Sequence, residues 1–312
     1  MRGRFGGATV TVESMSSWWF APVPARRLDL VRAATFGYAV LWLIVRVRYV
    51  WDVAGLPARR FHPVGVLTWF DSQPSRTAIM LVWGLAVCGS LLAACGRAVR
   101  LSASIGSLAM LVIATFTSSF GQVFHTEHLL VLHLLVLAVF VVVDTSAGQD
   151  ERTGWALSLM MAIVVVSYVV AGLAKLRFSG ADWLTGDVLR NWVAADNLRK
   201  LLLNDFHSPL GGWLAGVEWI WPPVAALTLM VELGAPIALT SGRARLLWLA
   251  VAWSFHVGVF VIMAITFPYQ LTGVAYLAFL PVERIETWAR QFFSSRRRVG
   301  FGRLGTVGSD QR

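Results

Sequence analysis

Lysine is rare in this sequence, and one of the two lysines stands at the end of an apolar run. Lys and Arg together number 27, yet only Lys175 and Lys200 are lysine. Burial can tune a lysine amine to act as a base, whereas arginine stays protonated. Taken alone, however, a lysine at the end of an apolar helix is more often an anchor whose amine reaches the membrane surface. Lys175 is therefore a candidate catalytic base, with anchoring as the alternative.

A short polar link carries His125 and His128 shortly before another apolar run. If the link is helical, these two histidines share a face because they are three residues apart. Together with Glu127 they raise the alternative of a metal site. The order His-Thr-Glu-His lacks the spacing of the zinc motif HExxH, and no third ligand is evident. We therefore predict no metal and interpret His128 as a hydrogen-bonding helper and His125 as a pocket residue.

Three further polar residues fall inside apolar runs. His256 and Glu232 are placed where an unpaired polar group is expensive, so each is expected to face a partner or a cavity. His133 lies deeper in its run and is predicted to be a hydrogen-bonded core residue. Whether the partner of His256 or Glu232 is a ligand or another helix stays open at this point.

The amino-acid composition indicates the environment in which this chain folds. Hydrophobic residues make up 57% and charged residues 14% of the sequence, and the mean hydropathy is +0.65, which together indicate an integral membrane protein. The net charge of +10 does not indicate nucleic acid binding, because the arginines cluster in short connections and in the tail. We interpret this basicity as a topology signal and as contact with membrane phospholipids.

The elements that must position the polar residues are long apolar helices. We predict an all-α polytopic membrane protein, a bundle of about eight transmembrane helices. The predicted spans are 28–51, 77–95, 101–120, 128–143, 155–176, 218–239, 246–266 and a last, short stretch that ends at residue 280.

Between the fifth and sixth spans, residues 177–217 form the longest polar stretch. Within it, apolar side chains recur at helical spacing beside charged ones, which predicts an amphipathic helix at the membrane surface. The apolar positions are Trp183, Leu184, Val188, Leu189, Trp192 and Val193.

Charge placement predicts the orientation in a plasma membrane. With eight spans and a cytoplasmic N-terminus, the basic turns 97–100 and 243–245 and the arginine-rich tail all lie inside. Seven spans would put the tail outside. We predict a cytoplasmic or interfacial lead-in (1–21), a transmembrane domain (22–282) and a basic, amphipathic and then disordered cytoplasmic tail (283–312). Lys175, the histidine link and the 177–217 segment then meet at the outer face.

The segment AGLAKLRFSGADWLTGDVLRNWV (171–193) resembles the membrane domain of vitamin K-dependent gamma-glutamyl carboxylase and its bacterial relatives, the horizontally transferred transmembrane (HTTM) domain family. The shared pattern is Ala-Gly-x-x-Lys-Leu, then Asp-Trp, then a glycine three residues later. A second match is the Phe-His pair and the apolar run at 254–281, and weaker matches are Arg32, the 125–128 link and Glu232 before Pro236. In this sequence the main pattern falls on Ala171, Gly172, Lys175, Leu176, Asp182, Trp183 and Gly186.

The resemblance implies a chemistry for Lys175. In the carboxylase, the matching lysine is implicated in deprotonating vitamin K hydroquinone. The resemblance therefore implies a reduced quinone of the vitamin K or menaquinone type as cofactor. It implies His128 and His256 as helpers of Lys175, and His125, Asp182, Trp183 and Glu232 as pocket residues. The large extramembrane domain of the carboxylase is not matched, so glutamate carboxylation is not implied, and a separate soluble protein is a possible partner.

Two hypotheses follow from the sequence. In the first, the protein is a membrane enzyme that uses a lipid-soluble quinol at an outward-facing pocket, with Lys175 as base. In the second, it is a non-catalytic helical bundle, such as a carrier, an immunity protein or an assembly partner. Lys175 would then form an ion pair with a carboxylate such as Asp182.

Overall fold

The computed structural model describes residues 17–121, 123, 125–144, 149–240, 242–288 and 291. Its regular structure is mostly helical, as predicted, with one exception. The strands β1 (Pro22–Pro24) and β2 (Glu151–Thr153) form a two-stranded antiparallel pair. Most of the predicted lead-in (1–16) and most of the predicted tail, including Phe292, lie outside the described residues.

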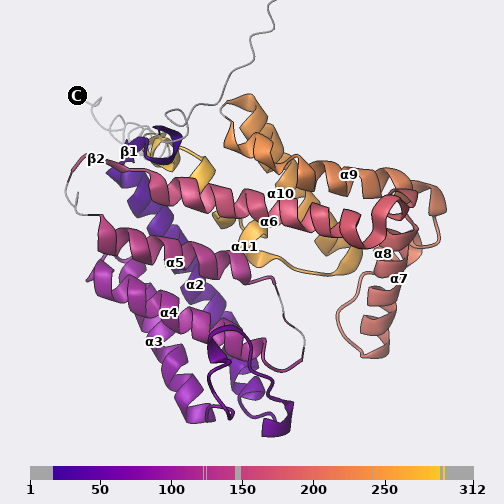
Figure 1. Ribbon diagram of the computed structural model, residues 1–312, viewed down its shortest axis with the longest axis horizontal. Coiled ribbons are helices and arrows are strands. Elements are labelled where there is room, and N and C mark those ends of the chain that lie inside the picture. The colour runs from indigo at the N-terminus through magenta and orange to yellow at the C-terminus, as the bar shows by residue number, and fades with distance from the viewer. Residues whose placement is uncertain are drawn as a thin grey trace, which may run out of the picture.

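The first half of the chain forms four helices that pack in sequence order (Figure 1). The third and second of these approach closely because Gly89 faces Gly106. A Cβ atom on Gly106 would lie 2.8 Å from the backbone nitrogen of Ser90, so small residues let the two backbones meet, as is common between membrane helices. These helices are α2 (Ala25–Val53), α3 (Arg76–Ala94), α4 (Val99–Thr117) and α5 (His128–Val143), with the short helices η1 (Ala58–Arg60) and η2 (Gly65–Leu67) between α2 and α3.

The second half is built around one long helix, α6 (Trp155–Ser179), which runs beside α9 and α10 in Figure 1. The short helices α7 and α8 lie at one end of it. A single large hydrophobic core draws on residues from Leu28 to Val282. The elements after α6 are η3 (Gly180–Thr185), α7 (Asp187–Leu202), α8 (Pro209–Leu214), η4 (Glu218–Ile220), α9 (Trp221–Leu233), η5 (Ala235–Leu239), α10 (Arg243–Met263), α11 (Pro268–Leu271) and η6 (Val274–Phe279).

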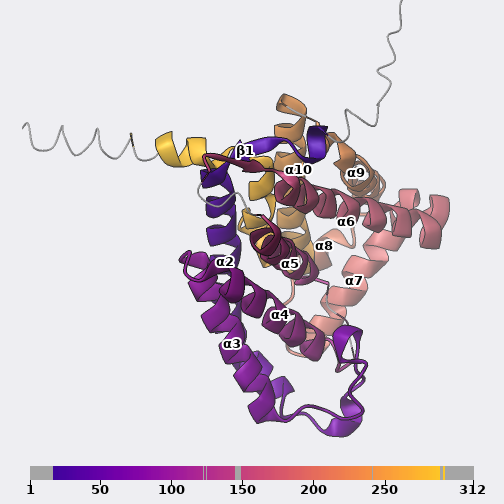
Figure 2. The ribbon, with the colours of Figure 1, turned by 60° about the vertical axis from the view of Figure 1, so that its left-hand side comes forward.

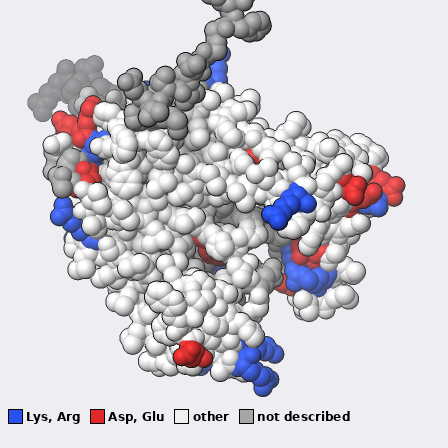
Figure 3. All heavy atoms as spheres, viewed as in Figure 1, with Lys and Arg blue, Asp and Glu red and all other residues white. Residues whose placement is uncertain are grey.

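Among the described residues, five helices are long and apolar enough to cross a membrane: α2, α3, α4, α6 and α10. Large apolar side chains are exposed on their outer faces, for example Val45 (71%), Leu81 (67%) and Leu101 (65%). Such exposure fits contact with lipid, because water would disfavour it. Charged side chains are sparse across the middle of the face shown in Figure 3 and gather towards its margins. Helix α5 has the predicted bounds but only 16 residues, fewer than the roughly 20 that a straight span needs.

Two predicted spans are not continuous helices, so the predicted count of about eight is not confirmed. The sixth is divided into α9 and η5 because Pro236 has no N–H to donate to the carbonyl of Glu232. The last is divided into α11 and η6 at Gly273, which has a left-handed φ of 77°. Interrupted helices are tolerated at membrane depth where protein surrounds them, and most of the side chains of η6 are buried.

The predicted amphipathic helix in residues 177–217 is likewise divided. Gly186 adopts a left-handed φ of 83° and separates Trp183, in η3, from Trp192 and Val193, in α7. A Cβ atom at Gly186 would collide with the backbone of Trp221, so the close approach of two segments explains the break. Trp192 is 64% exposed, whereas Trp183 is 6% exposed. The apolar positions therefore face in two directions.

The basic turns and the tail gather at one end of the bundle. The guanidinium of Arg32, near the start of α2, donates to the carbonyl of Ala93, at the end of α3. Arg27 forms a two-bond ion pair with Glu283 (2.7 and 2.9 Å). Glu283 belongs to a helix at residues 282–288, which Figure 2 shows in yellow beside β1 and the start of α2. Arg245 donates to the carbonyl of Phe279 (3.4 Å). Residues 54–75, 118–127 and 180–220 connect the helices at the opposite end.

Candidate functional site

Lys175, which is half-buried, forms an ion pair with the buried Glu232. The amine lies 2.5 Å from Oε1 of the carboxylate, which joins α6 to α9. The two helices approach closely because Gly172 is one turn away, where a Cβ atom would lie 2.8 Å from a methyl carbon of Leu233. The alternative prediction that Lys175 pairs with a carboxylate is confirmed, but the carboxylate is Glu232 and not Asp182, which is exposed in the first turn of η3.

Trp183 covers the amine from a second side. The Lys175 nitrogen lies 5.3 Å from the centre of its indole ring, within the range of a cation–π interaction. The indole N–H is directed to α9, 3.1 Å from the carbonyl oxygen of Ala225 and 3.2 Å from the hydroxyl of Thr228. The Lys, Trp and glycine positions of the sequence pattern therefore form one local structure that holds α6, η3 and α9 together around Lys175.

The ion pair leaves part of each partner unused. Glu232 is 3% exposed, and its second oxygen, Oε2, is buried without a hydrogen-bond partner among the described residues. The Lys175 side chain is 23% exposed. A lysine ammonium has three donors, and the described residues accept a hydrogen bond from one of them. A buried acceptor and an accessible donor group therefore lie side by side.

His256 belongs to a hydrogen-bonded chain beside this pair. Its Nε2 lies 2.7 Å from the hydroxyl of Tyr168, which lies 2.8 Å from the hydroxyl of Tyr276. Tyr168 is two turns before Lys175 on α6 and interacts electrostatically with Glu232. His256 is 5% exposed, and its Nδ1 has no hydrogen-bond partner among the described residues.

The two tyrosines are functional candidates that the sequence reasoning missed. A signal was present, because the chain has only 5 tyrosines and Tyr168 precedes Lys175 by seven residues on the same helix face. If Tyr276 donates to Tyr168, and Tyr168 donates to Nε2 of His256, every hydroxyl of this chain is used. His256 then carries its proton on Nδ1, and the chain ends in one free buried donor.

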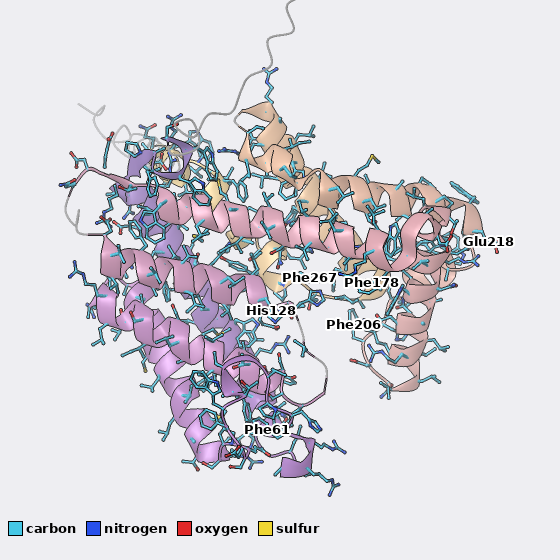
Figure 4. The ribbon with its side chains drawn as sticks, viewed as in Figure 1. Phe61, His128, Phe178, Phe206, Glu218 and Phe267 are labelled. Atoms are coloured by element: carbon cyan, nitrogen blue, oxygen red, sulfur yellow. The ribbon has the colours of Figure 1, made fainter. Side chains whose placement is uncertain are left out.

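His125 and His128 lie near the pair without bonding to it. The ring of Phe267 lies between two histidines, with its centre 5.4 Å from that of His125 and 4.8 Å from that of His256. The face in Figure 3 is hollowed near its centre, and Figure 4, drawn from the same side, labels His128 and Phe267 in that region. Among the described residues, no hydrogen bond joins His128 to Lys175, so direct help from His128 is not supported.

The link closes a single turn, in which the His128 N–H lies 3.4 Å from the carbonyl oxygen of His125, but it is not part of a helix because α5 begins only at His128. The pKa of His125 is lowered by partial burial and by the nearby charges of His128 and Lys175, although its ring stays partly exposed. Glu127 forms an ion pair with Arg46 (3.6 Å). In the described part of the chain, no group of three or more His, Cys, Asp or Glu side chains could hold a metal ion.

His133 is the hydrogen-bonded core residue that the sequence predicts. Its Nδ1 lies 2.8 Å from the hydroxyl of Tyr269, and its Nε2 lies 3.2 Å from the carbonyl oxygen of Met160. Both ring nitrogens have partners and the side chain is fully buried. His133 thus joins α5, α6 and α11 and leaves no polar atom for a ligand.

Comparisons of the chain with protein-family models, with curated proteins and with solved structures find no match. What the site can do follows from its geometry. A buried carboxylate oxygen without a donor, beside an ammonium with unused donors, can bind a hydroxyl group and take its proton. The apolar surroundings exclude water, which strengthens both interactions.

Proposed function

We propose that this protein is a multi-pass membrane enzyme that binds a lipid-soluble quinol and removes a proton from it at the Lys175–Glu232 pair. The observation that carries the proposal is the unpartnered, buried oxygen of Glu232 beside an accessible ammonium. Unpaired polar atoms are expensive within a bilayer and mark binding sites more often than surface charges do. The resemblance of residues 171–193 to the HTTM family supports the same reading.

A quinol suits this site in two respects. Its ring hydroxyls are weak acids that need a base and a positive charge to ionise near neutral pH. Its prenyl tail is apolar and can arrive through the lipid that surrounds the exposed apolar faces of the helices. A separate soluble protein would supply any further substrate, and the quinol would be of the vitamin K or menaquinone type.

The proposed location is the plasma membrane, with both termini in the cytoplasm and the Lys175 site towards the outer face. The gathering of Arg27, Arg32 and Arg245 at one end of the bundle supports this orientation, because positive charge is retained inside. Reporter fusions after Gly154 and Gly180 test it. An outside signal at Gly180 and an inside signal at Gly154 are expected, and an inside signal at Gly180 would contradict the outer pocket.

The function is tested by mass spectrometry of the lipids and quinones that copurify with the protein in mild detergent. We expect a quinone with the wild type and strong depletion in Lys175→Ala. Arg177→Ala is the matched control, because Arg177 is an exposed cation two residues away and its loss should leave the quinone in place. A wild type that carries no quinone, and does not take one up when menaquinone is added, would contradict the proposal.

The second hypothesis, a non-catalytic bundle that acts as a carrier, an immunity protein or an assembly partner, has one observation in its favour. Lys175 has a carboxylate partner and an aromatic partner, as a purely structural lysine would. Under this hypothesis, Lys175→Ala lowers stability and changes no ligand content. The copurification experiment therefore separates the two.

A further inference from the structure

The acceptor in the site is an oxygen of Glu232. Oε1 accepts a hydrogen bond from Lys175, whereas Oε2 has no donor among the described residues and is shielded from water. A buried carboxylate oxygen without a hydrogen bond is an unfavourable arrangement, and taking up a proton relieves it. The free lone pairs of the site therefore belong to the carboxylate.

The two contacts of the Lys175 amine are ones that favour a cation. The Glu232 carboxylate lies 2.5 Å away, and the face of the Trp183 indole attracts a cation and not a neutral amine. An ammonium has no lone pair, so it donates hydrogen bonds and cannot accept a proton. The contacts that fix Lys175 thus oppose the role of free base.

We propose that Oε2 of Glu232 accepts the proton of the bound quinol and that Lys175 stabilises the anion that remains. The inference rests on the proposed function and assigns the roles within that site. It makes Glu232 the catalytic base and Lys175 the cation that lowers the energy of the developing oxyanion.

The proton transfer balances without an oxidant or reductant. The O–H bond of one quinol hydroxyl breaks, and an O–H bond forms on Oε2. The quinol becomes a monoanion, Glu232 becomes neutral, and Lys175 keeps its charge. The ammonium loses an anionic partner and gains another, so the number of charges in the apolar site does not change. Its two unused donors can bond to the new oxyanion.

The inference is tested with a redox-simple probe, a prenylated naphthol that carries a single hydroxyl and whose anion absorbs at longer wavelength than its neutral form. The protein is purified in lipid nanodiscs, and the anion band of the bound naphthol is recorded at neutral pH for the wild type, Glu232→Gln, Glu232→Asp and Lys175→Arg. Size-exclusion chromatography and thermal unfolding confirm that each variant is folded. Binding of the neutral naphthol is measured separately by equilibrium dialysis.

We expect the anion band in the wild type, its loss in Glu232→Gln with binding of the neutral naphthol retained, and partial rescue in Glu232→Asp. Lys175→Arg should keep the band, since arginine is a permanent cation. The opposite pattern, a band that persists in Glu232→Gln or disappears in Lys175→Arg while the neutral naphthol still binds, would overturn the inference alone. A wild type that binds no naphthol would contradict the proposed function as well.

Discussion

Lys200 and Lys175 are both held by neighbouring helices, but their surroundings differ in how much of the ammonium is used. Lys200 donates to the carbonyl oxygens of Met263 (2.6 Å) and Ala264 (3.3 Å), and it lies 2.8 Å from Asp196 Oδ2 in an ion pair. These contacts cap the C-terminal end of α10, where Ala264 turns left-handed with a φ of 51°. In the described part of the chain, Lys175 has a single hydrogen-bond acceptor, Glu232.

The two buried histidines repeat the contrast. His133 uses both ring nitrogens, on Tyr269 and Met160, whereas His256 uses only Nε2, on Tyr168. The polar atoms of the Lys200 and His133 side chains thus have partners within the fold. Tyr168, which bonds to His256, lies two turns before Lys175 on α6, so the unpartnered atoms Glu232 Oε2 and His256 Nδ1 belong to helices that pack against α6. Other buried polar atoms without partners lie elsewhere among the described residues, for example at Thr35 and Ser90, so it is the accessible ammonium beside Glu232 that distinguishes the Lys175 site.

The largest expected effect is on the Lys200 side of the comparison. Lys200→Met leaves the carbonyl oxygens of Met263 and Ala264 at the end of α10 without their donor, whereas Asp196 keeps its ion pair with Arg199 (2.8 Å), so we expect a loss of about 3 kcal/mol in the free energy of unfolding. Lys175→Met should cost less, about 1 kcal/mol, because Glu232 can neutralise itself by taking up a proton. Thermal unfolding in nanodiscs, followed by tryptophan fluorescence, measures both. Equal losses of stability in the two variants would contradict the proposed difference between Lys200 and Lys175.

Replacing the histidines gives the second test. His133→Leu leaves the Tyr269 hydroxyl without its histidine partner and removes the second hydrogen bond to the Met160 carbonyl, which keeps its helical bond in α6, so a loss of about 2 kcal/mol in stability is expected. His256→Leu unpairs one hydroxyl and also removes an unpartnered nitrogen, so about 1 kcal/mol is expected. Quinone content should show the reverse order, with His256→Leu depleted and His133→Leu not, provided that both variants fold. A quinone loss confined to His133→Leu would reverse our assignment.

On the Lys200 side, strong acid should remove the contribution of Asp196 to stability. Burial alone would raise the pKa of Asp196, but the adjacent Lys200 and Arg199 outweigh it, so the pKa lies below its ordinary value. A carboxyl with a depressed folded-state pKa contributes stability above its unfolded-state pKa, and that contribution is lost as the pH falls through the folded-state value. The stability gap between the wild type and Asp196→Asn should therefore be constant near neutral pH and close in strong acid. A stability gap that persists in strong acid would contradict the claim that the ionised carboxylate of Asp196 stabilises the fold.

A similarly small loss of stability is expected from a change at Trp183. Trp183→Phe keeps an aromatic face over Lys175 but loses the indole hydrogen bond to α9, so stability should fall by about 1 kcal/mol. Trp192→Phe is the control, since that ring is 64% exposed, and it should leave stability nearly unchanged. Thermal unfolding compares the two variants. A larger loss of stability in Trp192→Phe than in Trp183→Phe would contradict the role of the Trp183 indole hydrogen bond.

The sequence predicts the long helices well because their apolar runs are continuous. The bounds of α5 are predicted to the residue, and His133 is correctly predicted as a core residue. The interruptions between α9 and η5 and between α11 and η6 are not predicted, because the apolar run continues through Pro236 and Gly273 whether or not the helix does. Partners across the bundle are the least predictable part, since the Lys175–Glu232 pair joins residues that are 57 positions apart in sequence. Asp182, which is nearer in sequence, was therefore the wrong choice.

The comparison of the two lysines can be measured directly by competitive amine labelling, because the chain contains only these two. The folded protein in nanodiscs is treated with a small acylating reagent, and the extent of modification at each lysine is read by peptide mass spectrometry with and without a short-tailed naphthoquinol. Acylation requires the neutral amine, so the labelling is carried out at alkaline pH, where the rate for each lysine reflects its accessibility. Our account predicts faster modification of Lys175, whose side chain is 23% exposed, than of Lys200, at 9%, and protection of Lys175 alone by the naphthoquinol. Equal modification of both lysines, or no protection of Lys175 at saturating naphthoquinol, would contradict it.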